Sequence, residues 1–150
     1  MTSFENTEIT FKHWCQQNDV QIMVLSTYSD MFDIAGIDAV IEYKRQIRTV
    51  QFRCRNRSDY QDVTVRCKSR IMPENILYKI QNVAWFIYIT PYWWVILDTS
   101  FYEHLMPIRP QPSSNADGSQ FEAYPIAELR PYIVDSFGLQ PFSKSLMEAF

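Results

Sequence analysis

The sequence predicts an α/β protein in which a mixed β-sheet is flanked by helices and carries a basic β-hairpin as an extension. Apolar and polar residues alternate in residues 37–43 and 48–55, which indicates two strands joined by a turn. Helical patterns with N-terminal start signals span residues 3–17, where a Thr-x-x-Glu capping box starts the helix, and 73–82, where a proline lies in the first turn. Two continuous apolar runs within residues 84–97 are typical of strands that are covered on both faces.

The remaining elements follow from similar patterns. Residues 20–25 form a short apolar run, which we expect to be a strand at or near the centre of the sheet. Residues 63–68 alternate again and predict a further strand that continues the basic surface of the hairpin. Residues 99–105 predict a short helix, 107–119 a flexible Pro- and Ser-rich loop, and 126–134 a helix interrupted by a proline.

Length and composition favour a single globular domain. With 150 residues, 47% of them hydrophobic, the chain can bury a substantial core. We expect one domain over residues 1–150, with a core at about 3–98 and a C-terminal extension, 99–150, that serves oligomerisation. No apolar run reaches the roughly 18 residues of a membrane span and the N-terminus does not resemble a signal peptide, so we expect a cytoplasmic protein without a membrane partner. Three cysteines without C-x-x-C spacing favour reduced, packed thiols.

Positive charge is concentrated in residues 44–70. This segment holds nine Lys or Arg residues against two acidic ones, in a chain whose net charge is −3. Because a phosphate responds to the local field, we expect the segment to bind nucleic acid; the alternative is a merely solvated hairpin surface. The expected DNA-binding residues are Lys44, Arg45, Arg48, Arg55, Arg57, Arg66, Lys68 and Arg70.

A carboxylate, an amide and a cation are predicted to converge on one face of the hairpin. A turn near residues 45–46 would bring Asp38 across from Arg53, with Gln51 diagonal to it. Glu8 lies on or beside the buried face of the first helix, where a carboxylate needs a partner or a metal; the alternative is a rim glutamate that reaches water. Asp38, Gln51 and Glu8 offer the oxygen ligands that suit a hard divalent cation such as Mg²⁺. Two loop carboxylates, Asp30 and Asp33, are alternative ligands.

These residues, in this order, resemble the PD-(D/E)xK nuclease superfamily, which has the restriction-endonuclease-like fold. Its pattern is an Asp at a strand start, then an acidic residue or Gln, one residue and Lys on the next strand, with a Glu on the preceding helix in many members. Gly36-Ile37-Asp38 and Gln51-Phe52-Arg53 occupy these places, and the resemblance covers roughly residues 3–98. The whole chain is also similar to a homing endonuclease of this superfamily that is encoded in a cyanobacterial group I intron in a transfer-RNA gene.

The resemblance implies a site-specific endonuclease of double-stranded DNA that works as a homo-oligomer, either a homodimer or a homotetramer built as a dimer of dimers. It implies Mg²⁺, or another divalent cation such as Mn²⁺ or Ca²⁺ in its place, with Asp38 as a direct ligand, Gln51 coordinating the metal or its waters, and Glu8 as a further ligand or acting through water. The catalytic set is therefore Glu8, Asp38, Gln51 and Arg53.

Arg53 departs from this pattern, because it stands where the superfamily has a lysine that orients or activates the attacking water. Arginine stays protonated and cannot act as a general base, although it can clamp a phosphate. Three alternatives therefore remain open: an attenuated DNA-binding protein on a nuclease fold, a junction-resolving or restriction nuclease, and a non-catalytic assembly protein. Glu42-x-Lys44 imitates the E-x-K motif but lies on the same strand as Asp38.

Overall fold

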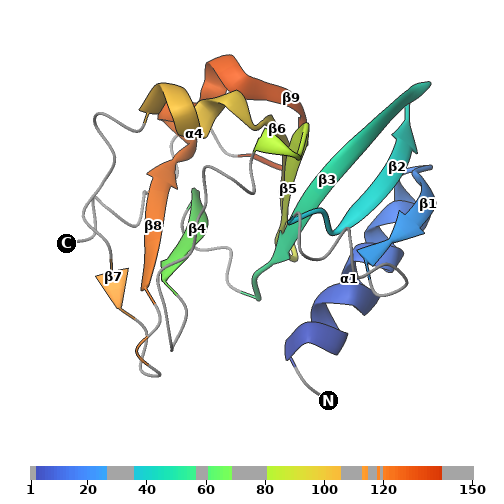
Figure 1. The fold of residues 1–150 in the computed structure, drawn as a ribbon, viewed down its shortest axis with the longest axis horizontal. Helices are drawn as coiled ribbons and strands as arrows, with labels where there is room; N and C mark the ends of the chain where they lie inside the picture. Colours follow the sequence, from blue (N-terminus) through green and yellow to red (C-terminus); the bar gives the residue numbers. More distant parts are fainter. Residues whose placement is uncertain are drawn as a thin grey trace.

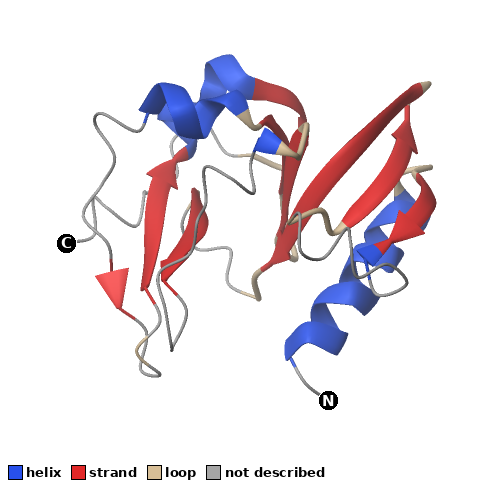
Figure 2. Ribbon diagram, viewed as in Figure 1, coloured by secondary structure: helices blue, strands red, loops and turns tan. Residues whose placement is uncertain are grey.

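The protein is described by a computed structural model that covers residues 3–26, 36–56, 61–68, 81–105, 113–114, 118 and 120–139. Its elements are α1 (Ser3–Gln17), β1 (Gln21–Leu25), β2 (Ala39–Tyr43), β3 (Gln46–Cys54), β4 (Asp62–Lys68), β5 (Trp85–Ile89), β6 (Trp94–Asp98), α4 (Ser100–Leu105), β7 (Ser113–Ser114), β8 (Gln120–Pro125), α5 (Ile126–Leu129), a 3₁₀ turn (Arg130–Tyr132) and β9 (Ile133–Phe137). The predicted α/β class is therefore confirmed (Figures 1 and 2).

The strands form two sheets. The larger has the order β1-β2-β3-β5-β6-β9 and the smaller has the order β4-β8-β7. Neighbours in the larger sheet are antiparallel except for β3 and β5, which are parallel, so the sheet is mixed as predicted. Because β3 and β5 are parallel, the chain between them crosses over the sheet, and β4 lies within that crossover.

Helix α1 covers one face of the larger sheet (Figure 1). The predicted span of this helix is confirmed, and its apolar stripe is buried: Phe11 is fully inaccessible and stacks on the Phe52 ring at a centroid distance of 3.9 Å. Trp14 and Cys15 extend this core under the helix. The even-numbered residues of β3 therefore face α1, as the sequence alternation predicts.

The opposite face packs against the smaller sheet, α4 and α5. This second core contains residues from all of these elements: Val63, Val65, Phe86, Tyr88, Trp93, Val95, Leu97, Phe101, Tyr102, Tyr124, Ile126 and Leu129. The two sheets are also joined by a hydrogen bond of 3.0 Å between Thr64 Oγ1 and Tyr88 OH. The odd-numbered residues of β3 thus face the side of the larger sheet on which β4 lies.

The hairpin turn is shorter than predicted. Lys44 and Arg45 have positive φ angles of 49° and 67°, so they form a two-residue turn and Tyr43 pairs directly with Gln46. The expected turn over residues 44–47 is therefore wrong, and the pairing register between β2 and β3 differs from the expected one. The Asp38 N–H donates to Val50 O over 2.9 Å, which places Asp38 across from Gln51 instead of Arg53.

Three further expectations are corrected. Strand β1, which was expected at or near the centre, lies at the edge of the larger sheet, because among the described residues it pairs only with β2. Strand β4 belongs to the smaller sheet and does not continue the hairpin surface, and its Thr64 is only 9% exposed. The predicted helix over residues 126–134 ends at Leu129, and the chain continues through the 3₁₀ turn into β9.

The C-terminal part of the chain belongs to the fold. Strand β9 completes the larger sheet, and β8, which the pattern did not reveal, completes the smaller one. The predicted core of 3–98 is thus extended by residues 120–139, while a role of the C-terminal part in oligomerisation stays a prediction. The short helix expected at 99–105 and the two apolar strands within 84–97 are confirmed.

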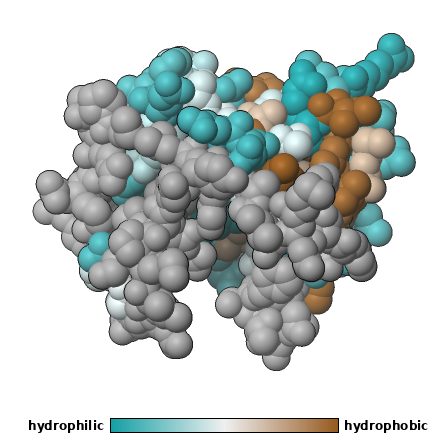
Figure 3. Space-filling view, in the orientation of Figure 1, coloured by the Kyte–Doolittle hydropathy of each residue, from teal (hydrophilic) through white to brown (hydrophobic). Residues whose placement is uncertain are grey.

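Some expectations fall on residues that are not described. The helix at 73–82 and the loop at 107–119 lie almost entirely there, apart from Gln81 and Asn82 and, in the loop, β7 and Gly118. Within the described ranges, none of the helices is both long and apolar enough to cross a membrane. Figure 3 shows hydrophilic residues at the tip of the hairpin and apolar ones below it. Among the large hydrophobic side chains of the described residues, Met23 and Ile47 are about half exposed, at 48% and 53%.

Candidate active site

Asp38 lies just before β2 and is held by three hydrogen bonds, two to β3 and one to Ser26, the residue after β1. Its N–H donates to Val50 O, and its carbonyl accepts from Ser26 N–H over 2.8 Å. Its carboxylate oxygen Oδ2 accepts from the Phe52 N–H over 3.0 Å. The carboxylate is therefore oriented by the backbone of the neighbouring strand, which is the rigid support that a metal ligand requires.

Gln51 is fixed by a contact to the segment that leads into β2. Its Nε2 donates to Gly36 O over 2.7 Å, which leaves Oε1 as the amide atom able to ligate a cation. Gly36 is buried and has a φ of 81°, a conformation that favours glycine, so its carbonyl reaches the Gln51 side chain through a backbone position that other residues adopt only with strain. Asp38 and Gln51 are thus brought together as predicted, although through a different register.

Arg53 is partly buried and is in register with Tyr88 of β5. Burial raises the pKa of Tyr88, and the positive charges of Arg55 and Arg53 oppose that shift. Both arginines are thus close enough to Tyr88 to influence it, on the face that carries Gln51. The structure places Arg53 two residues beyond Gln51 on the same face of β3, as predicted.

Glu8 lies on α1, which covers the other face of the sheet. It forms an ion pair with Lys12, one turn along the helix, at 3.7 Å, and its side chain is 20% exposed. The helix reaches the end of β3 beside it, because the Cys54 thiol donates to Thr7 O over 3.7 Å. Glu8 therefore lies near the end of the strand that carries Gln51 and Arg53, but approaches from the helix side of the sheet.

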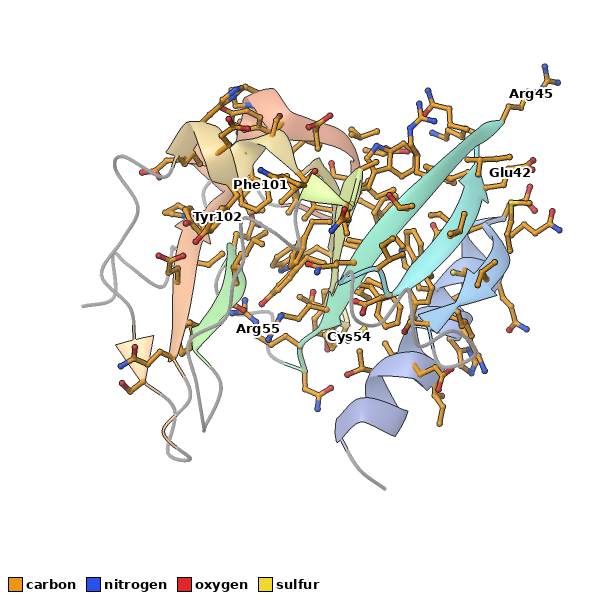
Figure 4. All side chains as sticks on the ribbon, viewed as in Figure 1. Glu42, Arg45, Cys54, Arg55, Phe101 and Tyr102 are labelled. Carbon is orange, nitrogen blue, oxygen red and sulfur yellow. The ribbon has the colours of Figure 1, made fainter. Side chains whose placement is uncertain are left out.

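The described basic residues fall into different environments. Lys44 Nζ lies 2.8 Å from Asp135 Oδ2, so its charge is already compensated, and Arg48 packs over the Trp85 ring at 5.5 Å. Arg45 is exposed at the tip of the hairpin (Figure 4). Since β3 rises by roughly 3.3 Å per residue, this tip lies about 26 Å from Arg53. The exposed tip of the hairpin is therefore far from the candidate site.

The other candidate DNA-binding residues are only partly described. The backbone of β4 carries Arg66 and Lys68, whose side chains lie outside the described residues, as do Arg57 and Arg70 entirely. The alternative metal ligands Asp30 and Asp33 also lie outside them. The alternative motif Glu42-x-Lys44 stays a prediction, but its lysine is engaged by Asp135.

The two described thiols are reduced and packed, as predicted. Burial is the main cause that raises the pKa of Cys15 and of Cys54 to about 12, so both remain thiols at neutral pH. In the described part of the chain, no group of three or more His, Cys, Asp or Glu side chains is arranged to hold a metal ion. The expected ligand set is different in kind, since it combines two carboxylates with an amide oxygen.

Three contributors to the site were not identified from the sequence. Tyr88 and Thr64 lie below the arginines, and the Asp62 carbonyl accepts from Arg55 Nη2 over 3.3 Å. Asp135, which engages Lys44 at the distant hairpin turn, was also not identified. Tyr88 lies in an apolar run, and the other three residues lie on segments that pair only with strands distant in the chain. No local sequence pattern predicts these contacts, because they depend on which strands become neighbours.

Comparisons with protein-family models, with curated proteins and with solved structures found no match to this chain.

Proposed function

We propose that the protein is a divalent-metal-dependent, site-specific endonuclease of double-stranded DNA, with a restriction-endonuclease-like fold. The observation that carries this proposal is the pair formed by Asp38 and Gln51. Two hydrogen bonds lock these side chains across the start of β2 and the end of β3, with Arg53 beside them on the same strand. A carboxylate and an amide oxygen held next to a guanidinium suit a bound cation and a phosphate in contact with each other.

The donor set fits Mg²⁺. Asp38 and the Oε1 atom of Gln51 would hold the cation, and Glu8 would contribute from the helix side, directly or through water. When bound, such a cation supplies a Lewis acid and a water of lowered pKa for phosphodiester hydrolysis. The chain itself orients the ligands, because the Phe52 N–H fixes the Asp38 carboxylate and Gly36 O fixes the Gln51 amide.

The element order also supports the proposal. A helix is followed by three antiparallel strands and then, after a crossover, by a strand parallel to the third. This order agrees with the fold that the resemblance implies. Because one site cuts one strand, a double-strand break requires at least two copies related by a two-fold axis, and we propose a homo-oligomer for this reason.

The test is cleavage of a DNA library in Mg²⁺ followed by sequencing of the ends. We expect discrete ends with the parent protein, none with Asp38→Asn and none with the parent in EDTA. The Asp38→Asn variant is the matched control, since its side-chain oxygen can still accept from the Phe52 N–H. Ends that persist in Asp38→Asn, or that form equally in EDTA, would contradict the proposed site.

A second candidate function is favoured by Arg53, which cannot accept a proton. The protein would then bind the same DNA without cutting it. The variant Arg53→Lys separates the two functions: nicking gained by this variant and absent from the parent identifies an attenuated nuclease. Retention of DNA by both, with no cutting by either, identifies a binding protein.

A further inference from the structure

Arg55 follows directly after β3 and is held between the two sheets. Its N–H continues the parallel ladder by donating to Ile89 O over 2.9 Å. Its guanidinium lies over the Tyr88 ring at 5.4 Å, and Nη2 donates to the carbonyl of Asp62 at the start of β4. Figure 4 shows the Arg55 side chain extending from the end of β3 toward β4. Both its backbone and its side chain are therefore positioned.

The ring beneath Arg55 is itself fixed. Tyr88 is fully buried, and its hydroxyl is hydrogen-bonded to Thr64 Oγ1. A guanidinium over a buried aromatic ring keeps its charge and loses little freedom when it binds an anion, because its plane is already set. This arrangement is typical of an arginine that is prepared to bind a phosphate.

The spacing of Arg53 and Arg55 suggests which phosphate each one takes. Residues two apart on an extended strand lie about 6.6 Å apart and point to the same side. That distance is close to the separation of neighbouring phosphates along one DNA strand. A single strand of DNA running along the end of β3 would then present successive phosphates to the two guanidinium groups.

We propose that Arg55 binds the phosphate next to the scissile phosphate on the same DNA strand, while Arg53 binds the scissile phosphate itself. Tyr88 acts as a positioning residue that sets the plane of the Arg55 guanidinium, and Thr64 fixes Tyr88. This inference rests on the proposed function for the identity of the scissile phosphate. It assigns one basic residue of the 44–70 segment to a defined phosphate.

The first experiment measures binding to a short DNA duplex by fluorescence anisotropy, in Ca²⁺ and over a series of salt concentrations. For Arg55→Gln we expect the slope of log K against log salt to become shallower by about 0.9, the value for one lost phosphate contact. Arg130→Gln is the matched control, because Arg130 is exposed on the 3₁₀ turn and carries the same charge. Its slope should equal that of the parent.

Arg55→Lys tests the positioning. It keeps the charge, so the slope should stay unchanged, while the loss of the planar contact with Tyr88 should weaken binding by about five-fold. Tyr88→Phe keeps the ring but loses its hydrogen bond to Thr64, so it should weaken binding less than Arg55→Lys does. Thermal melting of each variant identifies any loss of folding. Binding by Arg55→Lys as tight as that of the parent would refute the positioning role.

The second experiment uses a duplex that carries a neutral methylphosphonate next to the mapped cut. This change should weaken binding by the parent and leave binding by Arg55→Gln unaffected. An unchanged slope in a folded Arg55→Gln overturns the inference. If the methylphosphonate weakens binding by both proteins equally, Arg55 does not contact that phosphate and the assignment is wrong. If Arg55→Gln has a shallower slope but the parent cleaves no DNA, the Arg55 contact with phosphate is supported and the endonuclease function is refuted. Failure of the parent to bind DNA at low salt refutes both.

Discussion

The hydrogen bond from Gln51 Nε2 to Gly36 O makes the fold and the candidate site depend on the same side chain. Gln51→Glu is the informative change. A glutamate would remove the donor and bring an anionic oxygen against the carbonyl of Gly36, which belongs to a buried residue. Leaving a buried acceptor unsatisfied costs about 1–3 kcal/mol, so we expect the free energy of unfolding without metal to fall by that amount.

The matched control for this change is Gln46→Glu. Gln46 lies at the other end of β3, is exposed and pairs with Tyr43 next to the hairpin turn, so it receives the same change of charge without losing a buried contact. Its free energy of unfolding should change by less than about 0.5 kcal/mol. Urea unfolding in EDTA, followed by tryptophan fluorescence, measures both variants against the parent.

Mg²⁺ should reverse the loss. A carboxylate is a stronger ligand for a hard cation than an amide oxygen, so Gln51→Glu should be stabilised by Mg²⁺ more than the parent. A cation at 100 times its dissociation constant contributes about 2.7 kcal/mol, enough to restore the stability of the variant. The reasoning is refuted if Gln51→Glu is as stable as the parent in EDTA, or if Mg²⁺ stabilises the two proteins equally.

Three other predictions concern the support of the site. Phe11→Ala should lower the free energy of unfolding by about 3–5 kcal/mol, because the ring is fully buried and stacked on β3; a loss below 1 kcal/mol in urea unfolding would contradict this packing. Asp135→Asn should release the lysine at the hairpin turn and steepen the salt dependence of DNA binding by up to about 0.9; an unchanged slope would show that this lysine does not reach phosphate. In a Cys67→Ser background, iodoacetamide should modify Cys15 and Cys54 slowly at pH 8 and faster as the pH rises past 9.0 toward about 12, because only the thiolate reacts; rapid labelling of the folded protein at pH 8 would show exposed thiols.

The elements that the sequence predicted correctly are those with local signals. The first helix carries a capping box and an apolar stripe, and the strands near residues 85–89 and 94–98 are uniformly apolar. The placement of Asp38 and Gln51 on one face of the sheet also followed from local alternation, since each residue faces away from the core under α1. Its register did not, because it depends on whether the turn has two or four residues. Lys44 and Arg45 adopt positive φ without being Gly or Asn, so their residue types gave no signal for the tight turn.

The parts that escaped prediction depend on long-range pairing. Strand β4 reads as an alternating basic strand, and its separation from the hairpin follows only from its pairing with β8, more than 50 residues later in the chain. Strand β9 has an exposed and mixed pattern that resembles a helix end, and it becomes a strand because β6 offers it an edge. Tyr88 gained its role under the arginines in the same way, from the parallel pairing of β5 with β3.

The same neighbours give a physical reason for an arginine at position 53. A lysine there would lie in a partly buried position close to Arg55, and both burial and a neighbouring positive charge lower the pKa of an amine. Arginine keeps its charge in that environment, so in the proposed function it would secure the contact with a phosphate but could not take a proton from water. Arg53→Lys would reverse this balance, because a lowered pKa raises the neutral fraction of an amine and a neutral amine can accept a proton. A cleavage rate that rises with pH in this variant, and not in the parent, would place the reacting water beside residue 53.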